Sequence, residues 1–104
     1  MNMTQVLKSQ SVRLNPKYFT CTVRRKRVEL TPDQYQFLYL LMSHPRRVFR
    51  RQEILQILEH PATPKSVDVC VHKLRHRIGY DLIRTVQGVG YSFPESVERG
   101  QVRL

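Results

Sequence analysis

The alternation of apolar and polar residues predicts short strands in the first third of the chain. In the segment 19–23, Phe-Thr-Cys-Thr-Val alternates like a strand with one buried face. Three strands rich in β-branched and aromatic residues are expected over 12–14, 18–23 and 27–30, with a turn at Asn15-Pro16. The basic stretch 24–27 forms a tip between two of them, where a phosphate contact and a solvated turn are both open interpretations.

After this region the apolar residues recur every three or four positions, which predicts helices. The first helix runs from 32 to about 43, because Thr31 is an N-cap, Pro32 suits the first helical position and Gln34 completes a capping box. Its expected buried residues are Tyr35, Leu38, Leu41 and Met42. The second helix is expected over 51–59, and the residues facing inward are Ile54, Leu55 and Leu58.

The third predicted helix, residues 64–78, has one apolar and one polar face. The apolar face, within about 60° of arc, carries Val67, Val71, Leu74 and Ile78. The opposite face carries Val69, His72, Lys73 and His76, flanked by Asp68, Arg75 and Arg77. Hydrogen-bond donors, positive charge and one small apolar side chain suit the major groove of DNA, where bases present acceptors and thymine methyl groups. An ordinary solvated surface has the same polarity, so this helix alone leaves both interpretations open.

A β-hairpin follows the third helix. Its strands are expected over 82–86 and 91–93, with Gln87-Gly88-Val89-Gly90 as the tip, where positive φ costs glycine little. Two helices joined by a short turn form a helix-turn-helix, and a hairpin directly after them is a wing.

Charge strengthens the nucleic-acid interpretation. Lys and Arg number 18 against 8 acidic residues, so the formal net charge is +10. Self-repulsion of this size destabilises a compact state and indicates a polyanionic partner, with nucleic acid as the first candidate and an anionic membrane surface as the second. A membrane partner is not expected, because no segment combines a basic helix face with bulky apolar residues and no apolar run approaches 18 residues. The first ten residues lack a secretory pattern and the two cysteines have no disulfide spacing, which favours the cytoplasm.

Other chemistry is not supported by the residue spacing. His72 and His76 share a helix face, as metal ligands do, but Cys70 lies more than about 120° away from them and no fourth ligand is evident. Gly88 and Gly90 follow a strand without opening a helix, unlike a phosphate-binding loop. No carboxylate pair or nucleophile setting is recognisable. We therefore expect no metal, no cofactor and no enzymatic activity.

Four motifs carry a family resemblance. They are Leu30-Thr31, His44-Pro45-x-Arg47-Val48-Phe49-x-Arg51, Ser66-Val67-Asp68-Val69-x-Val71-x-Lys73-Leu74-Arg75, and Ile83-Arg84-Thr85-Val86-x-Gly88-Val89-Gly90-Tyr91. In this order they resemble the DNA-binding effector domain of OmpR/PhoB-type response regulators, from about Val12 to Phe93. The resemblance implies an α+β winged helix-turn-helix with an N-terminal antiparallel sheet, three helices and a C-terminal hairpin wing. Residues 1–11 are then a lead-in and first strand, 12–93 the winged helix domain, and 94–104 a flexible tail.

The resemblance also implies a binding scheme for a transcription regulator. The third helix enters the major groove, and the base-reading residues are Val69, His72, Lys73 and His76. The residues expected at phosphates are Arg50, Arg51, Lys65, Ser66, Arg75, Arg77 and Thr85. The wing residues at the adjacent minor groove are Arg84, Gln87 and Gly88. For Arg50 and Arg51, which oppose the dipole of the second helix, tolerated surface charge is an equally open interpretation. About five neutralised phosphates predict a slope of log affinity against log salt near −4 to −5.

Partners and regulation follow from the resemblance as well. Two subunits are expected head-to-tail on direct repeats, with symmetric pairing as the alternative. Gln87 stands where family wings often carry arginine, and the short loop 61–64 occupies the place that contacts RNA polymerase in family activators. The sequence shows no receiver domain, and its start at Met1 favours a free-standing regulator over an excised domain. The competing hypothesis is an adapter that binds RNA polymerase or another regulator in place of DNA.

Overall fold

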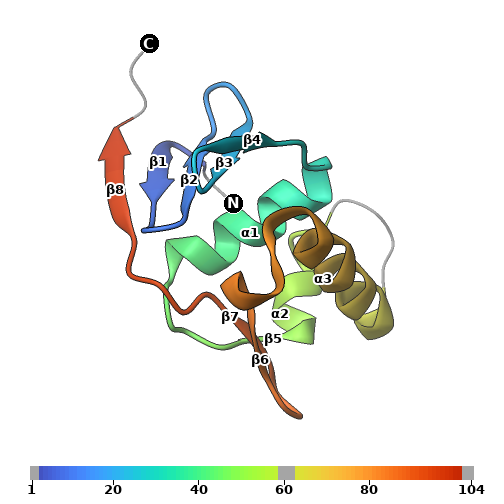
Figure 1. Ribbon diagram of the computed structural model, residues 1–104. Coiled ribbons are helices and arrows are strands. Elements are labelled where there is room, and N and C mark those ends of the chain that lie inside the picture. The colour runs from blue at the N-terminus through green and yellow to red at the C-terminus, as the bar shows by residue number, and fades with distance from the viewer. Residues whose placement is uncertain (1–2, 59–62, 102–104) are drawn as a thin grey trace.

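The N-terminal sheet is the first unit of the fold. The structure is a computed structural model that describes residues 3–58 and 63–101 (Figure 1). The sheet is antiparallel and has the order β4-β3-β2-β1-β8. Its strands are β1 (Gln5–Lys8), β2 (Val12–Asn15), β3 (Thr20–Val23), β4 (Lys26–Val28) and β8 (Glu98–Gln101). Leu7, Leu14 and Cys21 are cross-strand partners and are all buried, so this row forms the inner face of the sheet.

Two sequence predictions about strands are wrong. Tyr18 and Phe19 lie in a turn, because Phe19 takes a left-handed backbone conformation (φ 55°) before β3 begins. Residues 98–101 do not form a flexible tail: they are β8, which pairs with β1 along its full length. Strand β8 has no alternating apolar pattern that could predict it, since all four of its residues are exposed and the strand is held by backbone hydrogen bonds.

Helix α1 (Pro32–Ser43) has the predicted bounds, and it covers the inner face of the sheet (Figure 1). The Thr31 hydroxyl accepts from the backbone N–H of Gln34 at 3.2 Å, and the Gln34 side chain accepts from the N–H of Thr31 at 3.0 Å. Two tyrosine hydroxyls join helix to sheet: Tyr39 donates to the carbonyl of Gln5 at 2.7 Å, and Tyr35 to that of Thr20 at 3.3 Å. The four predicted core residues of this helix are buried.

The helix-turn-helix lies on the other side of α1 from the sheet (Figure 1). Its helices are α2 (Arg51–Leu55) and α3 (Pro64–Ile78), followed by a 3-10 turn, η1 (Tyr80–Leu82). Helix α2 is shorter than the predicted 51–59, because the chain turns after Leu55, where the N–H of Ile57 bonds back to the carbonyl of Ile54 at 3.1 Å. Residues 59–62 lie outside the described ranges. Within those ranges, no helix has the length and hydropathy that a bilayer crossing requires.

The wing is a three-stranded sheet with the order β5-β7-β6. The hairpin β6 (Arg84–Val86) and β7 (Gly90–Ser92) is joined by β5 (Phe49–Arg50), a strand that the sequence did not predict. Only Gly88 uses the positive φ expected of both glycines (φ 74°). Gly90 has a different role, since a Cβ at this position would lie 1.9 Å from the carbonyl oxygen of Phe49. Gly90 therefore lets β5 approach β7.

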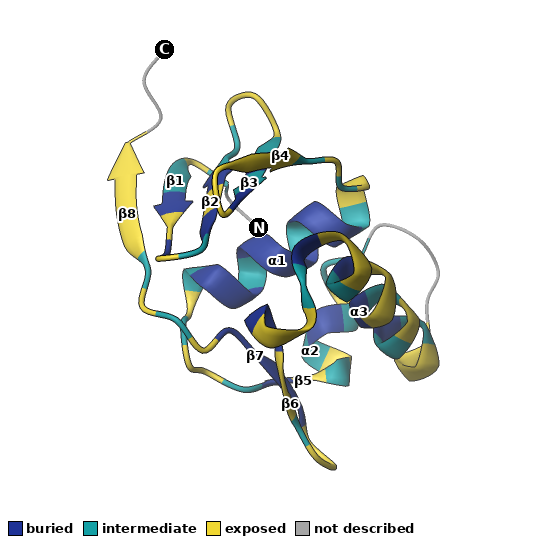
Figure 2. Cartoon of the chain, in the orientation of Figure 1, coloured by how far each residue is buried: buried dark blue, intermediate teal, exposed yellow. Residues whose placement is uncertain are grey.

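One hydrophobic core joins these elements. It extends from the sheet through α1 to α3 and the wing strands, and it includes the four predicted apolar residues of α3 (Figure 2). Because buried leucines such as Leu38 and Leu74 are fully enclosed, truncating one of them to alanine costs about 2–5 kcal/mol. The exposed face of α3 and the wing therefore rest on a well-packed core.

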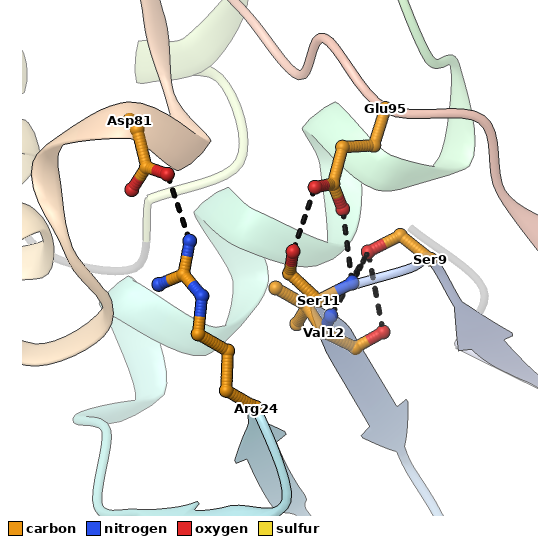
Figure 3. A network of polar contacts seen from close by, with 6 residues as sticks. All are labelled: Ser9, Ser11, Val12, Arg24, Asp81 and Glu95. Atoms are coloured by element: carbon orange, nitrogen blue, oxygen red, sulfur yellow. Dashed lines mark hydrogen bonds and ion pairs between the residues drawn. The ribbon is translucent and has the colours of Figure 1, made fainter.

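Two polar contacts also tie the sheet turns to the C-terminal half (Figure 3). The Glu95 carboxylate accepts from the N–H and the hydroxyl of Ser11, at 3.1 and 2.7 Å. Arg24, in the β3–β4 turn, pairs with Asp81 of η1 at 2.7 Å. Burial raises the pKa of Glu95, but hydrogen bonds from Ser9 and Ser11 outweigh it and leave the pKa below its ordinary value.

Candidate nucleic-acid interface

The polar face of α3 points away from the core over its whole length. The helix begins at Thr63, whose hydroxyl accepts from the N–H of Ser66 at 3.4 Å, while the Ser66 hydroxyl accepts from the N–H of Thr63 at 3.2 Å. The four residues predicted to read bases, Val69, His72, Lys73 and His76, are all exposed. Val69 is 45% exposed, a large fraction for an aliphatic side chain in a helix with a buried side.

His72, His76 and Tyr80 form a ladder along this face. The Nε2 atoms of the two histidines lie 3.2 Å apart, and the Tyr80 hydroxyl lies 3.0 Å from Nε2 of His76. The rings of neighbours meet edge to face. The ladder places three groups that can donate or accept hydrogen bonds side by side along the exposed face of α3 and the start of η1.

Cys70 does not join the histidines. It is half-buried on a different side of α3, and burial raises the pKa of its thiol to about 11, which keeps it protonated at neutral pH. Within residues 3–58 and 63–101, no group of three or more His, Cys, Asp or Glu side chains is placed to hold a metal ion.

Asp68 is the centre of a network that joins both helices to the wing. Its Oδ1 accepts from Nε of Arg51 in α2 at 2.7 Å and from the hydroxyl of Tyr91 in β7 at 2.5 Å. The hydrogen bond from Tyr91, followed by that from Arg51, holds the pKa of Asp68 below its ordinary value despite partial desolvation. The bond to Asp68 raises the pKa of Arg51 in turn. Arg51, predicted as a phosphate contact, is therefore already paired within the protein.

Arg75 forms the second joint between α3 and the wing. Its guanidinium donates to the carbonyl of Ile83 at 2.6 Å and to the hydroxyl of Thr85 at 2.7 Å. It also lies over the ring of Tyr91, with the guanidinium carbon 5.8 Å from the ring centroid. The two predicted phosphate contacts Arg75 and Thr85 thus bind each other, and they hold β6 against α3.

The start of α2, the start of α3 and the wing tip surround one groove of about 440 Å³. Its lining residues are Arg50, Arg51, Gln52, Pro64, Gly88 and Val89. Arg50 is exposed, and its backbone N–H donates to the Glu53 carboxylate at 3.1 Å, which lowers the pKa of Glu53. The acidic side chain in the first turn of α2 offsets the unfavourable position of the arginines relative to the helix dipole.

The remaining predicted residues flank this groove or α3. Lys65 and Ser66 line a smaller hollow of about 260 Å³ at the start of α3, next to Val69. Arg77, Arg84 and Gln87 are exposed on α3, β6 and the wing tip. The hydroxyl of Ser66 is occupied by the capping box, whereas Lys65 is exposed.

Sequence reasoning missed the roles of Asp68 and Tyr91. Both stand in the motifs quoted above, but periodicity placed Asp68 only on the flank of α3 and Tyr91 only in a strand. A signal was present: an acidic residue in a basic recognition helix and a tyrosine with a polar tip in a buried strand both call for partners. The sequence could not pair them, because 23 positions separate them.

Comparisons with known proteins agree with this geometry. The family model described as transcriptional regulatory protein, C terminal, matches residues 25–93. The response regulator protein PmrA of Pseudomonas aeruginosa is 34% identical over 87 residues, which cover 81% of this chain and 39% of PmrA. The transcriptional regulatory protein QseB of Escherichia coli O157:H7 is 36% identical over 92 residues, 86% of this chain and 42% of QseB.

Solved structures share the fold. The DNA-binding domain of CpxR from E. coli superposes with a TM-score of 0.76 at 25% identity, and the match covers 88% of this chain and 97% of that domain. The chain thus spans about two fifths of PmrA and QseB but nearly all of the CpxR domain.

Proposed function

The chain belongs to the family of C-terminal domains of transcriptional regulatory proteins, of the OmpR/PhoB type, and from this premise we propose that it is a sequence-specific regulator that binds double-stranded DNA. Helix α3 lies in the major groove and the wing reaches the adjacent minor groove. The protein acts by binding and not by catalysis, on DNA in the cytoplasm.

The observation that carries this proposal is the exposed polar face of α3, which stands on a buried apolar face. Four side chains are available there to base edges, and Lys73 can donate to the O6 and N7 acceptors of guanine. Val69 is placed to contact a thymine methyl group. A good bidentate contact is worth about 1–3 kcal/mol of discrimination between bases, and Lys73 or a neutral histidine contributes at the lower end.

Phosphate contacts divide into two groups under this proposal. Arg50 lines the groove, and Lys65 and Arg77 on α3 and Arg84 on β6 are exposed, so these four bind phosphate directly. Arg51 uses Nε for Asp68 but borders the same groove, which leaves its remaining N–H groups for phosphate. Arg75 and Thr85 hold the wing in position, and Ser66 caps α3. Five direct contacts predict a slope of log affinity against log salt of about −4.5.

Assembly on DNA is a further part of the proposal. Two copies bind head-to-tail on direct repeats about one helical turn apart, because a winged helix places one recognition helix in each half-site. A contact with RNA polymerase through the loop 61–64 remains a proposal from resemblance alone, since residues 61 and 62 lie outside the described ranges.

Selection from genomic DNA tests the function. The protein is mixed with sheared genomic fragments at 50 and 200 mM salt with heparin as competitor, and bound fragments are sequenced. We expect enrichment of a repeated motif and an affinity loss of about 500-fold between the two salt concentrations. Binding without any enriched motif would contradict sequence specificity.

The adapter hypothesis predicts a different outcome. An adapter does not need basic side chains on the outer face of α3, yet this chain carries Lys73 and Arg77 there. If heparin removed all DNA binding while purified RNA polymerase retained the protein, the adapter would replace the regulator that we propose.

A further inference from the structure

The outer face of the N-terminal sheet carries a second concentration of positive charge. Lys8 in β1 pairs with Arg13 in β2, Arg13 with Thr22 in β3, and Thr22 with Arg27 in β4. Directly opposed residues of an antiparallel sheet point to the same side, so these four form one row, which we call the outer basic row. Its three basic residues are exposed.

This charge is not neutralised within the protein. Among the residues that the structure describes, no ion pair includes Lys8, Arg13 or Arg27. Glu98 of β8 lies opposite Lys8, just beyond the end of the row. Like charges directly opposite each other destabilise a sheet, and Lys8 and Arg13 are such a pair.

The adjoining turn adds to the same patch at a cost in backbone strain. Arg24 and Arg25 form the β3–β4 turn with φ of 49° and 71°, a left-handed conformation in which asparagine and glycine are preferred. Arg24 is paired with Asp81, while Arg25 is exposed. A groove of about 590 Å³ lies between this turn and the β1–β2 turn, and its basic lining residues are Lys8, Arg13, Arg24 and Arg25.

This face points away from α3. Leu7, Leu14 and Cys21 lie on the opposite face of the same strands. They are buried and face α1, which lies between the sheet and the helix-turn-helix (Figure 1). A duplex in contact with α3 and the wing therefore leaves the outer basic row uncovered.

The chemistry of the row favours a polyanion over a protein or a membrane. Protein interfaces have an apolar core and interfacial segments insert bulky apolar residues, but the row contains lysine, arginine and threonine alone. Three interstrand spacings make it about 14 Å long, and duplex DNA of that length carries about eight phosphate charges.

We propose that the outer basic row binds the phosphate backbone of a second DNA duplex, so that one copy of the chain bridges two segments of DNA. The inference deepens the proposed function, since the first duplex is the one held by α3. Three phosphate contacts give the second duplex a salt slope of about −2.7, so its affinity falls about 40-fold between 50 and 200 mM salt.

A capture assay tests the bridge. A duplex carrying one selected half-site is immobilised and saturated with the protein, and a fluorescent duplex of unrelated sequence is added at 50 mM salt. The wild-type protein is expected to retain the fluorescent duplex, and K8E/R13E/R27E to lose it at least 10-fold while keeping its affinity for the half-site within 3-fold. Sedimentation with a 12-base-pair duplex distinguishes bridging by one copy from bridging by a dimer. A complex of one chain with two duplexes supports the proposal. A complex with equal numbers of chains and duplexes overturns it.

A variant with the same change in charge serves as the matched control. K65E/K73E/R77E, on α3, is expected to lose selectivity for the half-site but still to bind unrelated duplex through the sheet. Thermal unfolding confirms that both variants are folded.

Capture of the second duplex by K8E/R13E/R27E at the wild-type level overturns the proposal. Binding of the wild type to phosphatidylserine vesicles without capture of a second duplex overturns it in favour of a membrane surface. If the wild-type protein shows no selectivity for the half-site, the proposed function is contradicted instead. Sedimentation with a duplex of unrelated sequence then still tests whether one chain binds two duplexes.

Discussion

The α3–wing joint and the N-terminal sheet use arginine in opposite ways. At the joint, Arg51 is bound to Asp68, and Arg75 is bound to the carbonyl of Ile83 and the hydroxyl of Thr85, so these side chains hold elements together. On the sheet, Arg13 and Arg27 have no ion-pair partner among the described residues, and Arg13 lies opposite a like charge, Lys8. The number of arginines therefore says little about binding. An arginine that is bound to another group of the protein stabilises the fold. An arginine without such a partner is available to bind a ligand.

The largest effect expected is at Gly90. Gly90→Ala places a methyl group against the carbonyl of Phe49 and forces β5 away from β7, which costs more than about 3 kcal/mol of unfolding free energy. Urea denaturation measures the loss. Gly88→Ala is the control: its Cβ meets nothing within 4 Å, and the positive φ alone costs about 1 kcal/mol. Equal losses in the two variants would contradict the close approach of β5 and β7.

Arg75 and Arg77 both lie on α3, but Arg75 is hydrogen-bonded to other elements of the protein, whereas Arg77 is exposed. Arg75→Lys loses the paired bonds to Ile83 and Thr85, and we expect a loss of about 2 kcal/mol in stability. Arg77→Lys keeps a charge on an exposed side chain and should stay within about 0.5 kcal/mol of the wild type. Denaturation of both proteins gives the comparison. If Arg75→Lys were as stable as Arg77→Lys, Arg75 would not hold the wing.

On DNA, Lys73 and Lys65 are expected to differ in the kind of effect. Lys73→Ala should reduce discrimination against a mismatched base by about 1 kcal/mol, because it removes donors from the base-reading face. Lys65→Ala should weaken every sequence alike and reduce the salt slope by about one unit. Affinities for the selected site and its single mismatches, each at several salt concentrations, distinguish the two. Uniform weakening by Lys73→Ala would remove it from base readout.

Acid should weaken both the joint at Asp68 and the contact of Glu95 with the sheet. Asp68, Glu53 and Glu95 have pKa values below their ordinary values of 3.8, 4.5 and 4.5, so each binds fewer protons folded than unfolded. Their contribution to stability is present at neutral pH and decreases as the pH falls below about 4.5 through the folded pKa values. Melting temperatures from pH 7 to pH 3 should fall less for Asp68→Asn than for the wild type. A parallel decline would show that Asp68 does not contribute.

The smallest effect is expected on the sheet and has the opposite sign. Arg13→Gln removes the like-charge contact with Lys8, so without DNA it should raise stability by less than about 1 kcal/mol, most clearly at low salt. Thermal melting at 20 and 300 mM salt measures the gain. A loss of stability would mean that Arg13 has a structural role.

The sequence predicted the elements that depend on residues close together in the chain, and it did not predict the contacts between residues far apart. Capping residues and apolar spacing are local, and they predicted α1 and α3 with their bounds and buried faces. Strand β8 was not predictable, because exposed polar residues carry no periodic signal and the strand exists only through β1. Asp68 and Tyr91 were recognised as positions in the family motifs. The sequence did not show that they contact each other, because they lie far apart in the chain.

The sequence by itself determined the order of elements, the polarity of α3 and the excess of positive charge, since each follows from residue type and local spacing. Only the tertiary structure decided which charges are available. It pairs Arg51 and Arg75 inside the molecule and aligns Lys8, Arg13 and Arg27 on one open face, because strand register and the docking of α3 bring together residues that are far apart in the chain.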